Sequence, residues 1–423
     1  MNPSKTDPHP APQNHVELFF ADLGPGLITG CADDDPSGIS TYSVTGAAFG
    51  YGLLWTALVT FPMMVSIQMM CGRLGMVTGR GLSGVVRRRY SKWVLWGACA
   101  LLIVANVINI AADLGGMADA TQMLTGISSL VWNPVYTAVI VSFLFWSSYK
   151  QIAKIFKWIT LVLLAYIVTA FFARVDWHQA LRATLVPHFA WSRDYLSVLV
   201  GVLGTTISPY LFYWQASQEV EDERVRGGRR KGASDEDLRR LRVDVMTGMF
   251  ASNFVMYFII LTTAATLHAH GILQIATAKQ AAEALRPLAG NGAYLLFTLG
   301  LIGTGILAVP VLAGSCAYAI SEAAAWRASL EKKPRSAKKF YGVLAAAMTI
   351  GLVINYAGLD AVKMLFWSAV VNGVLAPPLI LLVILLTSDP RVMGDRVSSA
   401  MERGVGWVTF AIMGAAVVGL LIT

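Results

Sequence analysis

Long apolar segments restrict most strongly what this chain can fold into. Windows of about 20 apolar residues, each long enough to cross the hydrocarbon core of a bilayer, recur along the 423 residues. The chain is 56% hydrophobic and 14% charged, with a mean hydropathy of +0.58, which is too apolar for a soluble domain of this size. Membrane β-strands would give shorter segments of alternating hydrophobicity. The sequence therefore predicts an all-α integral membrane protein.

These segments predict about eleven transmembrane helices. Their expected ranges are 19–48, 52–72, 93–118, 131–148, 153–173, 195–218, 244–267, 291–324, 340–357, 361–387 and 404–422. Prolines break the first at Asp35-Pro36 and the sixth at Ser208-Pro209, because proline lacks the helical N–H and clashes with the preceding turn. Each broken helix opens a block of five, which predicts two inverted repeats (about 19–173 and 195–387) and an extra helix.

The basic residues indicate the orientation. Most of the 33 Lys and Arg residues fall in alternate loops on one side, which predicts a cytoplasmic N-terminus and a C-terminus outside, in a bacterial inner membrane. Residues 1–16 are expected to form a disordered cytoplasmic tail before a single transporter domain over 17–422. We assign Arg73 to one of these loops. We interpret Arg87-Arg88-Arg89 as a topology determinant, with lipid recognition as the alternative.

Three consecutive aspartates lie inside the first apolar segment. A carboxylate within a bilayer costs several kcal/mol unless a partner stabilises it, so Asp33-Asp34-Asp35 predicts a bound cation. At a helix break, unwound carbonyls point into the cavity, and the carbonyl of Ala32 is a candidate ligand beside the Asp35 carboxylate. Gly38 allows the chain to turn. The alternative is a surface loop joining two short helices.

The second break offers further oxygen atoms. Thr205 and Ser208 stand three residues apart before a proline, so a carbonyl and a hydroxyl can share one face. The alternative is ordinary packing of small residues around a proline kink. The pairing with the first break favours a cation site.

Several motifs in this order resemble the Nramp family of divalent metal transporters. The matching stretches are Gly24-Pro25-Gly26, Asp35-Pro36, the run 73–79, Ser208-Pro209 and the run 387–394. The resemblance covers about residues 17–422. It implies a LeuT-type fold of two inverted five-helix repeats, with a divalent cation bound between helices 1 and 6 as substrate and with no cofactor.

The departures from the family pattern concern the expected ligands. The family motif Asp-Pro-Gly-Asn ends here in Gly38, and the family motif Met-Pro-His begins here with Ser208. A glutamine of the tenth helix is matched by Leu375, with Asn372 as the nearby polar candidate. Asp34 and Asp33 are expected to attract the cation through bound waters, or else to face an aqueous vestibule or a neighbouring helix.

The altered ligands predict the substrate. Loss of a soft thioether removes a preference for Mn²⁺, Fe²⁺ or Cd²⁺, and an all-oxygen pocket rich in carboxylates suits partly hydrated Mg²⁺. This pattern resembles the Nramp-related magnesium transporters. We therefore predict Mg²⁺ transport, with Mn²⁺ as a second candidate substrate.

Proton coupling is expected to be weak or absent. The family resemblance implies proton symport, but the histidine that follows the proline in the family is Tyr210 here. The Asp and Glu that the family carries on its third helix match Ile110 and Asp113, so that one acid remains. We expect Asp113 to pair with a basic group or a backbone amide.

Other functions remain open at this stage. The first alternative is a proton-coupled Mn²⁺/Fe²⁺ importer of the usual Nramp type. A sodium-coupled symporter of organic solutes and a membrane-embedded enzyme fit less well, because the first would rarely carry an acidic triplet and no nucleophile or phosphate-binding motif supports the second. We expect no nucleic-acid or obligate protein partner besides the lipid bilayer. The charged segment 219–243 is interpreted as a solvated linker, with a cytoplasmic helix extension or gate contact as the alternative.

Overall fold

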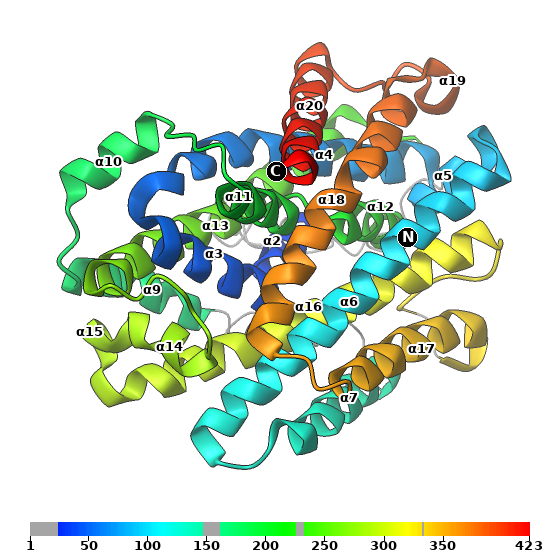
Figure 1. The fold of residues 1–423 in the computed structure, drawn as a ribbon. Helices are drawn as coiled ribbons and strands as arrows, with labels where there is room; N and C mark the ends of the chain where they lie inside the picture. The colour runs from blue at the N-terminus through cyan, green and yellow to red at the C-terminus, as the bar shows by residue number, and fades with distance from the viewer. Residues whose placement is uncertain (1–23, 147–160, 226–231, 332–333) are drawn as a thin grey trace, which may run out of the picture.

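The computed structural model describes residues 24–146, 161–225, 232–331 and 334–423, and these ranges contain helices and no strand (Figure 1). The predicted all-α fold is therefore confirmed. The longest helices are α4 (Trp55–Thr78), α6 (Lys92–Thr125), α7 (Ser129–Trp146), α13 (Asp235–Thr266), α16 (Ala293–Ala323), α17 (Lys338–Asn355), α18 (Ala361–Ser388) and α20 (Ala400–Ile422). Shorter ones are α5 (Leu82–Arg89), α9 (Leu164–Phe172), α10 (Trp177–Leu185), α14 (Ala278–Ala282), α15 (Arg286–Ala289) and α19 (Pro390–Met393).

Eight segments of the described chain are long and apolar enough to span a membrane. The predicted first, fifth and ninth spans have no counterpart among the eight, so the expected number of eleven is not established. The first is divided between two short helices, and part of the fifth lies outside the described residues. The predicted tail, residues 1–16, also lies outside them.

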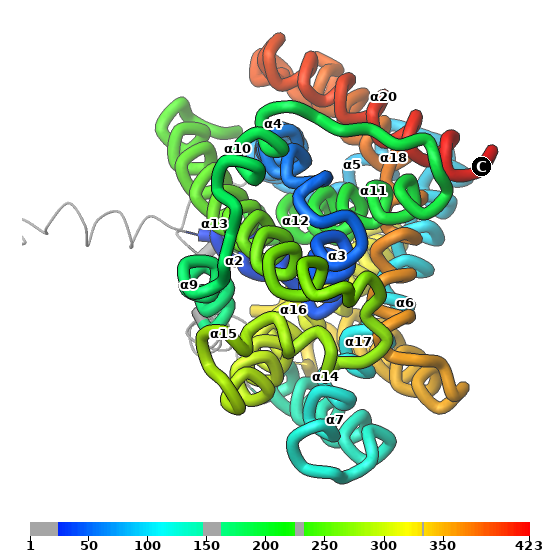
Figure 2. Tube along the Cα trace, turned by 60° about the vertical axis from the view of Figure 1, so that its left-hand side comes forward, coloured from blue at the N-terminus to red at the C-terminus, as the bar shows by residue number. Residues whose placement is uncertain are grey.

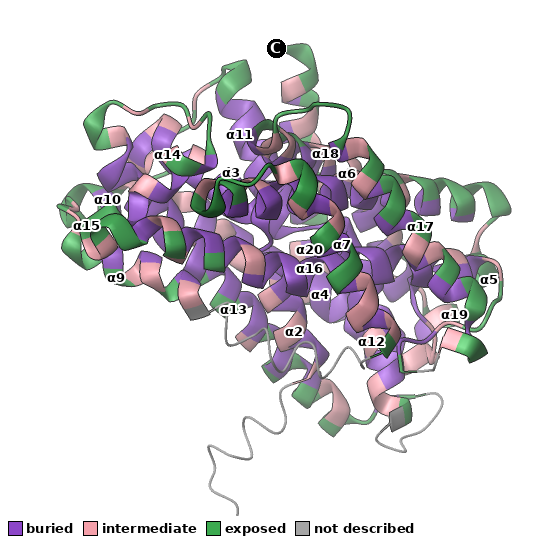
Figure 3. Ribbon diagram, turned by 90° about the horizontal axis from the view of Figure 1, so that it is seen from below, coloured by how far each residue is buried: buried purple, intermediate pink, exposed green. Residues whose placement is uncertain are grey.

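The outer surfaces of the long helices are apolar. On α7, Val131, Val135 and Val139 are 53%, 41% and 36% exposed, and their spacing of four residues places them on one face. Exposed residues also follow the outer helix faces in Figure 3, whereas the middle of the bundle is buried. An apolar face of this kind suits contact with lipid tails, as expected of an integral membrane protein.

Both predicted helix breaks are present. The first divides α2 (Pro25–Asp33) from α3 (Pro36–Phe49), and the second divides α11 (Arg193–Thr206) from α12 (Pro209–Val225). Proline occupies the first helical position after each break, where its missing N–H costs nothing because that group has no intrahelical partner. Asp35 is the N-cap residue of α3, with its side chain accepting the Gly38 N–H.

Helix α13 lies beside both halves of the first broken helix (Figure 2). Its contact with α2 is backbone to backbone, because a Cβ added to Gly30 would come 2.2 Å from the Gly248 carbonyl oxygen. Helix α11 meets α18 similarly, because a Cβ on Gly204 would lie 2.1 Å from the carbonyl oxygen of Ala369. Glycine at these positions brings the half-helices that precede each break into close contact with their neighbours.

The structure corrects two assignments of charged residues. Arg73 does not lie in a loop: it is inside α4, 7% exposed, and its guanidinium forms an ion pair of 2.7 Å with Glu402 at the start of α20. The segment 219–243 is also not a solvated linker where it is described. Helix α12 continues to Val225 and α13 begins at Asp235, and burial of Glu219 is stabilised by a 2.7 Å bond from the Gln215 amide.

Candidate metal site at the two helix breaks

Asp35 lies at the centre of the bundle with both carboxylate oxygens bonded. Oδ1 accepts the Gly38 N–H at 2.6 Å, and Oδ2 accepts the Asn109 side-chain amide at 2.8 Å. The residue is 3% exposed. The Gly38 bond follows from the local sequence, since an aspartate before a proline caps the helix that begins there. Asp35 thus connects the first break to α6.

Asp34 and Asp33 turn toward a different neighbour. The Ser252 hydroxyl of α13 lies 2.7 Å from Asp33 Oδ2 and 3.3 Å from Asp34 Oδ1. Asp33 is fully buried and Asp34 is 4% exposed, and Asp33 faces the neighbouring helix, which is one of the two alternatives to attracting the cation through bound waters. Asp33 Oδ1 has no hydrogen-bond partner among the residues that the structure describes. The three carboxylates therefore diverge between α6 and α13.

The Ala32 carbonyl, a predicted ligand, accepts a hydrogen bond from the Tyr210 hydroxyl at 2.9 Å. Tyr210 is the residue after Pro209, in the first turn of α12. This hydrogen bond joins the two broken helices at their breaks. The Ser315 hydroxyl of α16 donates to the Tyr210 carbonyl at 2.9 Å, which attaches the same residue to the surrounding bundle.

Thr205 and Ser208 are buried and their hydroxyls are engaged. The Ser208 hydroxyl lies 2.6 Å from the Thr205 carbonyl and 2.9 Å from that of Gly204. The Thr205 hydroxyl donates to the Tyr42 hydroxyl of α3 at 2.7 Å. Thr205 is therefore a second link between the broken helices, and the Ser208 hydroxyl satisfies carbonyls that the break would have left open.

Gly38 and Asn372, two further predicted ligands, differ in the groups that they place near the site. Gly38 contributes its N–H to Asp35, and a side chain there would meet the Asp33 carbonyl oxygen at 3.3 Å. Asn372 on α18 is 2% exposed, and its Oδ1 lacks a hydrogen-bond partner within the described part of the chain. It is thus an available buried oxygen, and its role as a ligand stays a prediction.

Two residues of α6 complete the surroundings of Asp35. Asp113 Oδ1 accepts the Ser37 N–H at 3.2 Å, in agreement with the expected backbone partner. Asn109 was not predicted. It lies one turn before Asp113, and polar residues four apart in an apolar helix share a face, so the spacing was a usable signal. Asn109 Oδ1 and Asp113 Oδ2 are buried acceptors to which no described residue donates a hydrogen bond.

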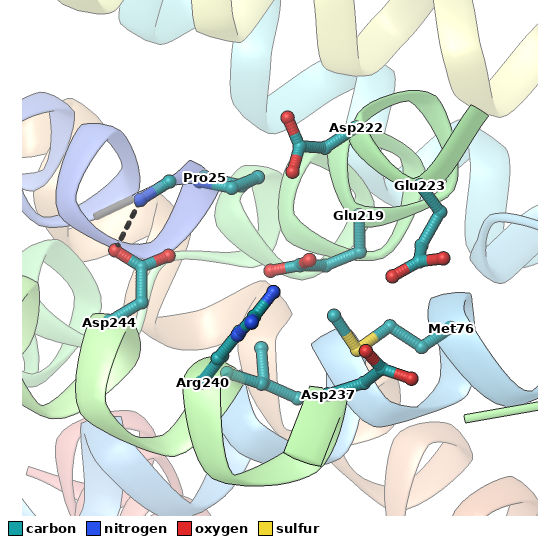
Figure 4. A pocket seen from close by; sticks show the side chains of 10 residues that line it. Pro25, Met76, Glu219, Asp222, Glu223, Asp237, Arg240 and Asp244 are labelled. Carbon is teal, nitrogen blue, oxygen red and sulfur yellow. Dashed lines mark hydrogen bonds between the residues drawn. The ribbon is translucent and has the colours of Figure 1, made fainter. Parts of the chain in front are cut away.

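Small cavities lie near the break and near the start of α2. One of about 10 Å³ includes Pro36, Ser40 and Asp119. The other, of about 140 Å³, is acidic, and Figure 4 shows its carboxylates around the start of α2. Its acidic residues are Glu219, Asp222, Glu223, Asp237 and Asp244.

Asp244 attaches the start of α2 to α13. Its carboxylate accepts the N–H groups of Gly24 at 2.8 Å, Gly26 at 2.6 Å and Leu27 at 3.0 Å. These N–H groups have no partner within the helix, and a negative charge is favourable at a helix N-terminus.

In the described ranges no three His, Cys, Asp or Glu side chains converge in a preformed metal cage. The candidate site is thus a buried group of oxygen atoms at the crossing of the breaks.

Comparison with known proteins decides the family. Residues 26–423 match the family described as natural resistance-associated macrophage protein-like, Nramp. The chain belongs to the Nramp family. Members of Nramp are metal-ion transporters and not enzymes, so this chain is a divalent metal transporter.

Individual Nramp relatives are distant in sequence. The divalent metal cation transporter MntH of Klebsiella pneumoniae subsp. pneumoniae is 28% identical over 406 residues, covering 94% of this chain and 92% of the relative. A manganese transporter of Eremococcus coleocola, in the crystal structure of one of its mutants, superposes with a TM-score of 0.73 at 18% identity, over 99% of this chain and 88% of the other.

A third likeness reaches beyond Nramp. Mhp1, a nucleobase-cation-symport-1 transporter in a closed conformation, superposes with a TM-score of 0.62 at 15% identity, over 95% of this chain and 90% of Mhp1. At these identities the likenesses establish the fold, which is the predicted LeuT-type fold. None of the relatives described here is named as a magnesium transporter, so the magnesium branch is unsupported.

Proposed function

We propose that this Nramp protein carries a divalent cation between the two helix breaks and that Mg²⁺ is its main substrate. The observation that carries the proposal is the chemistry around Asp35. The residues around it, Gly38, Asn109, Asp113 and Tyr210, offer oxygen and nitrogen groups, and Ser208 places a hydroxyl at the second break where the family motif has a methionine thioether. A hard cation such as Mg²⁺ prefers carboxylate, carbonyl and water oxygens.

The proposed roles differ among the site residues. Asp35 binds the ion directly, and the Ala32 carbonyl becomes a second ligand once the Tyr210 hydroxyl leaves it. Asn372 and Asn109 supply buried amide oxygens, and Asp34 holds ordered waters around the ion. Thr205, Ser208 and Gly38 maintain the breaks: the two hydroxyls satisfy neighbouring oxygens, and Gly38 orients the Asp35 carboxylate.

A second candidate substrate is Mn²⁺. It is favoured by the names of the relatives, which include MntH and a manganese transporter. Mn²⁺ also accepts carboxylate and carbonyl oxygens, so the oxygen-rich site does not oppose it. Loss of a thioether ligand should lower the affinity for Mn²⁺ but not the affinity for Mg²⁺. Competition between the two ions in a transport assay therefore separates the candidates.

We further propose an inner-membrane location with a cytoplasmic N-terminus and an outside C-terminus. The argument is the concentration of arginine at one end of the bundle, in α5 and after α16. On this orientation the acidic cavity at the start of α2 opens toward the cytoplasm. Its carboxylates would attract a cation on that side of the membrane.

Competition between ions tests the substrate. Protein in liposomes should take up Mg²⁺, and excess Mg²⁺ should lower uptake of trace Mn²⁺ because both ions use the same oxygens. The measurement uses metal-sensitive dyes inside the vesicles, with Ca²⁺ as a third ion and protein-free vesicles as the control. Mn²⁺ uptake without Mg²⁺ transport or competition by Mg²⁺ would assign the protein to Mn²⁺ instead.

The pH of the vesicle lumen tests proton coupling. We expect metal uptake without a matching acidification, because Asp113 is bonded to the Ser37 N–H and Tyr210 occupies the position of the family histidine. A pH-sensitive dye in the lumen reports proton entry, and a protonophore provides the calibration. Clear acidification that depends on the metal gradient would contradict uncoupled transport.

A further inference from the structure

A third cavity, of about 360 Å³, lies away from the helix breaks and is lined by four arginines among other residues. The residues come from the turn before α5, α5 itself, the end of α12, the end of α16 and the segment after it. The four arginines are Arg80, Arg87, Arg224 and Arg327. The volume is within the range of sites that bind small organic ligands.

The carboxylates of this cavity are bonded to other groups. Glu322 accepts the Gly84 N–H of α5 and the Ser217 hydroxyl of α12, each at 3.1 Å. Glu221 accepts the Tyr318 hydroxyl at 2.8 Å and the Leu330 N–H at 3.2 Å. Both carboxylates therefore have hydrogen-bond partners other than the arginines.

The arginines carry an excess of positive charge. None of the four takes part in an ion pair with the described residues. Burial, together with the charges of Arg88 and Arg87, lowers the pKa of Arg80, although the charge of Glu322 acts in the opposite direction. Cations this close to one another repel, and an anion between them would relieve the repulsion.

The structure also separates the run Arg87-Arg88-Arg89 into different environments. Arg87 lines the cavity, Arg88 does not, and Arg89 forms an ion pair of 2.7 Å with Asp389. Interpretation of the whole run as a topology determinant does not explain this difference. A specific role is therefore open to Arg87 and not to its neighbours.

Exposed tryptophans near α5 indicate the depth of the cavity in the membrane. Trp93 and Trp96, in the first turns of α6, are 89% and 46% exposed. Tryptophan collects at the level of lipid headgroups. Trp326 lines the cavity itself and has the Lys339 ammonium 4.7 Å from its ring centre. The cavity therefore lies where phosphate groups of lipids and of soluble molecules can both reach it.

We propose that this arginine cavity binds a phosphate-bearing anion. The planar guanidinium group donates two parallel hydrogen bonds to phosphate oxygens, which makes arginine the preferred residue for such ligands. The phosphate comes either from the headgroup of an anionic phospholipid or from a soluble organic phosphate. Because Arg224 belongs to α12, the bound anion ties the second half of a broken helix to α5 and to the segment after α16.

Thermal unfolding of the purified full chain tests this proposal. Phosphatidylglycerol should raise the unfolding temperature above that in phosphatidylcholine, and glycerol 3-phosphate should do so if soluble phosphates enter. Stabilisation by the lipid alone identifies a headgroup site, and stabilisation by the soluble compound identifies a site for free phosphates. Absence of stabilisation by either would overturn the proposal.

Two adjacent arginines provide matched variants. Arg87→Gln should weaken ligand binding about tenfold, as expected for one lost charge-assisted hydrogen bond. Arg88→Gln removes the same charge from the same helix but does not alter the lining, so it should weaken binding much less than Arg87→Gln does. Equal weakening in both variants would indicate diffuse attraction and refute a specific site. If Arg87→Gln does not fold, Arg327→Gln gives the same comparison.

Discussion

Replacement of Asp35 by asparagine is expected to abolish metal transport while the protein still folds. The carboxylate is 3% exposed, and removing one partner of a buried charge pair costs about 3 kcal/mol or more, which corresponds to over about 100-fold in affinity for the cation. Asparagine is as good an N-cap as aspartate, so the start of α3 should persist. Uptake into liposomes, together with the unfolding temperature, measures both effects.

Asp360 offers a matched control for this variant. It caps α18 as Asp35 caps α3, accepting the N–H three residues ahead at 2.9 Å, but it is exposed. Asp360→Asn and Asp360→Ala should therefore leave transport intact. Asp35→Ala should lose transport and also about 1 kcal/mol of stability, because alanine cannot cap. Normal transport by Asp35→Asn would exclude Asp35 as the direct ligand.

Gly30→Ala is expected to destabilise the protein strongly. The added methyl group would lie 2.2 Å from the Gly248 carbonyl oxygen and 2.6 Å from the Gly248 Cα, and backbone atoms cannot turn away as a flexible side chain can. Overpacking of this kind costs about 1–3 kcal/mol, and here it also pushes α2 away from the Asp244 carboxylate. The unfolding temperature and the recovery of monodisperse protein should both fall.

Gly414→Ala is the corresponding control. Gly414 lies within α20, and an added Cβ meets no heavy atom within 4 Å. Alanine is a better helix former than glycine, so this variant should be unchanged or more stable by up to about 1 kcal/mol. A similar loss of stability in both variants would show that the close contact of α2 with α13 is not the cause.

Local backbone chemistry made the helix breaks predictable. Asp35-Pro36 and Ser208-Pro209 end and begin helices because proline acts on the residues next to it. The many oxygen atoms at the two breaks were also predictable, because they belong to the same short segments. The number of spans was harder to judge, since α2 and α3 are each too short to cross a membrane alone.

Partners distant in the chain could not be predicted from local patterns. Ser252, which bonds Asp33, is 219 residues away, and Glu402, which pairs with Arg73, is 329 residues away. Counting basic residues placed Arg73 in a loop, because a charge near the end of an apolar segment looks the same whether it is solvated or buried beside a partner. Asn109 could have been predicted from the sequence, because it lies four residues before Asp113 in an apolar helix.

The hydrogen bond between Tyr210 and Ala32 has a consequence for the speed of transport. An ion that takes the Ala32 carbonyl must first displace the hydroxyl that holds it at 2.9 Å. The apparent affinity is then the intrinsic affinity multiplied by the fraction of molecules in which this carbonyl is free. If Ala32 is a ligand as proposed, the same hydroxyl competes with the ion for the carbonyl and favours its release. Such competition raises the turnover rate of a transporter, because an ion that is bound too tightly is released slowly.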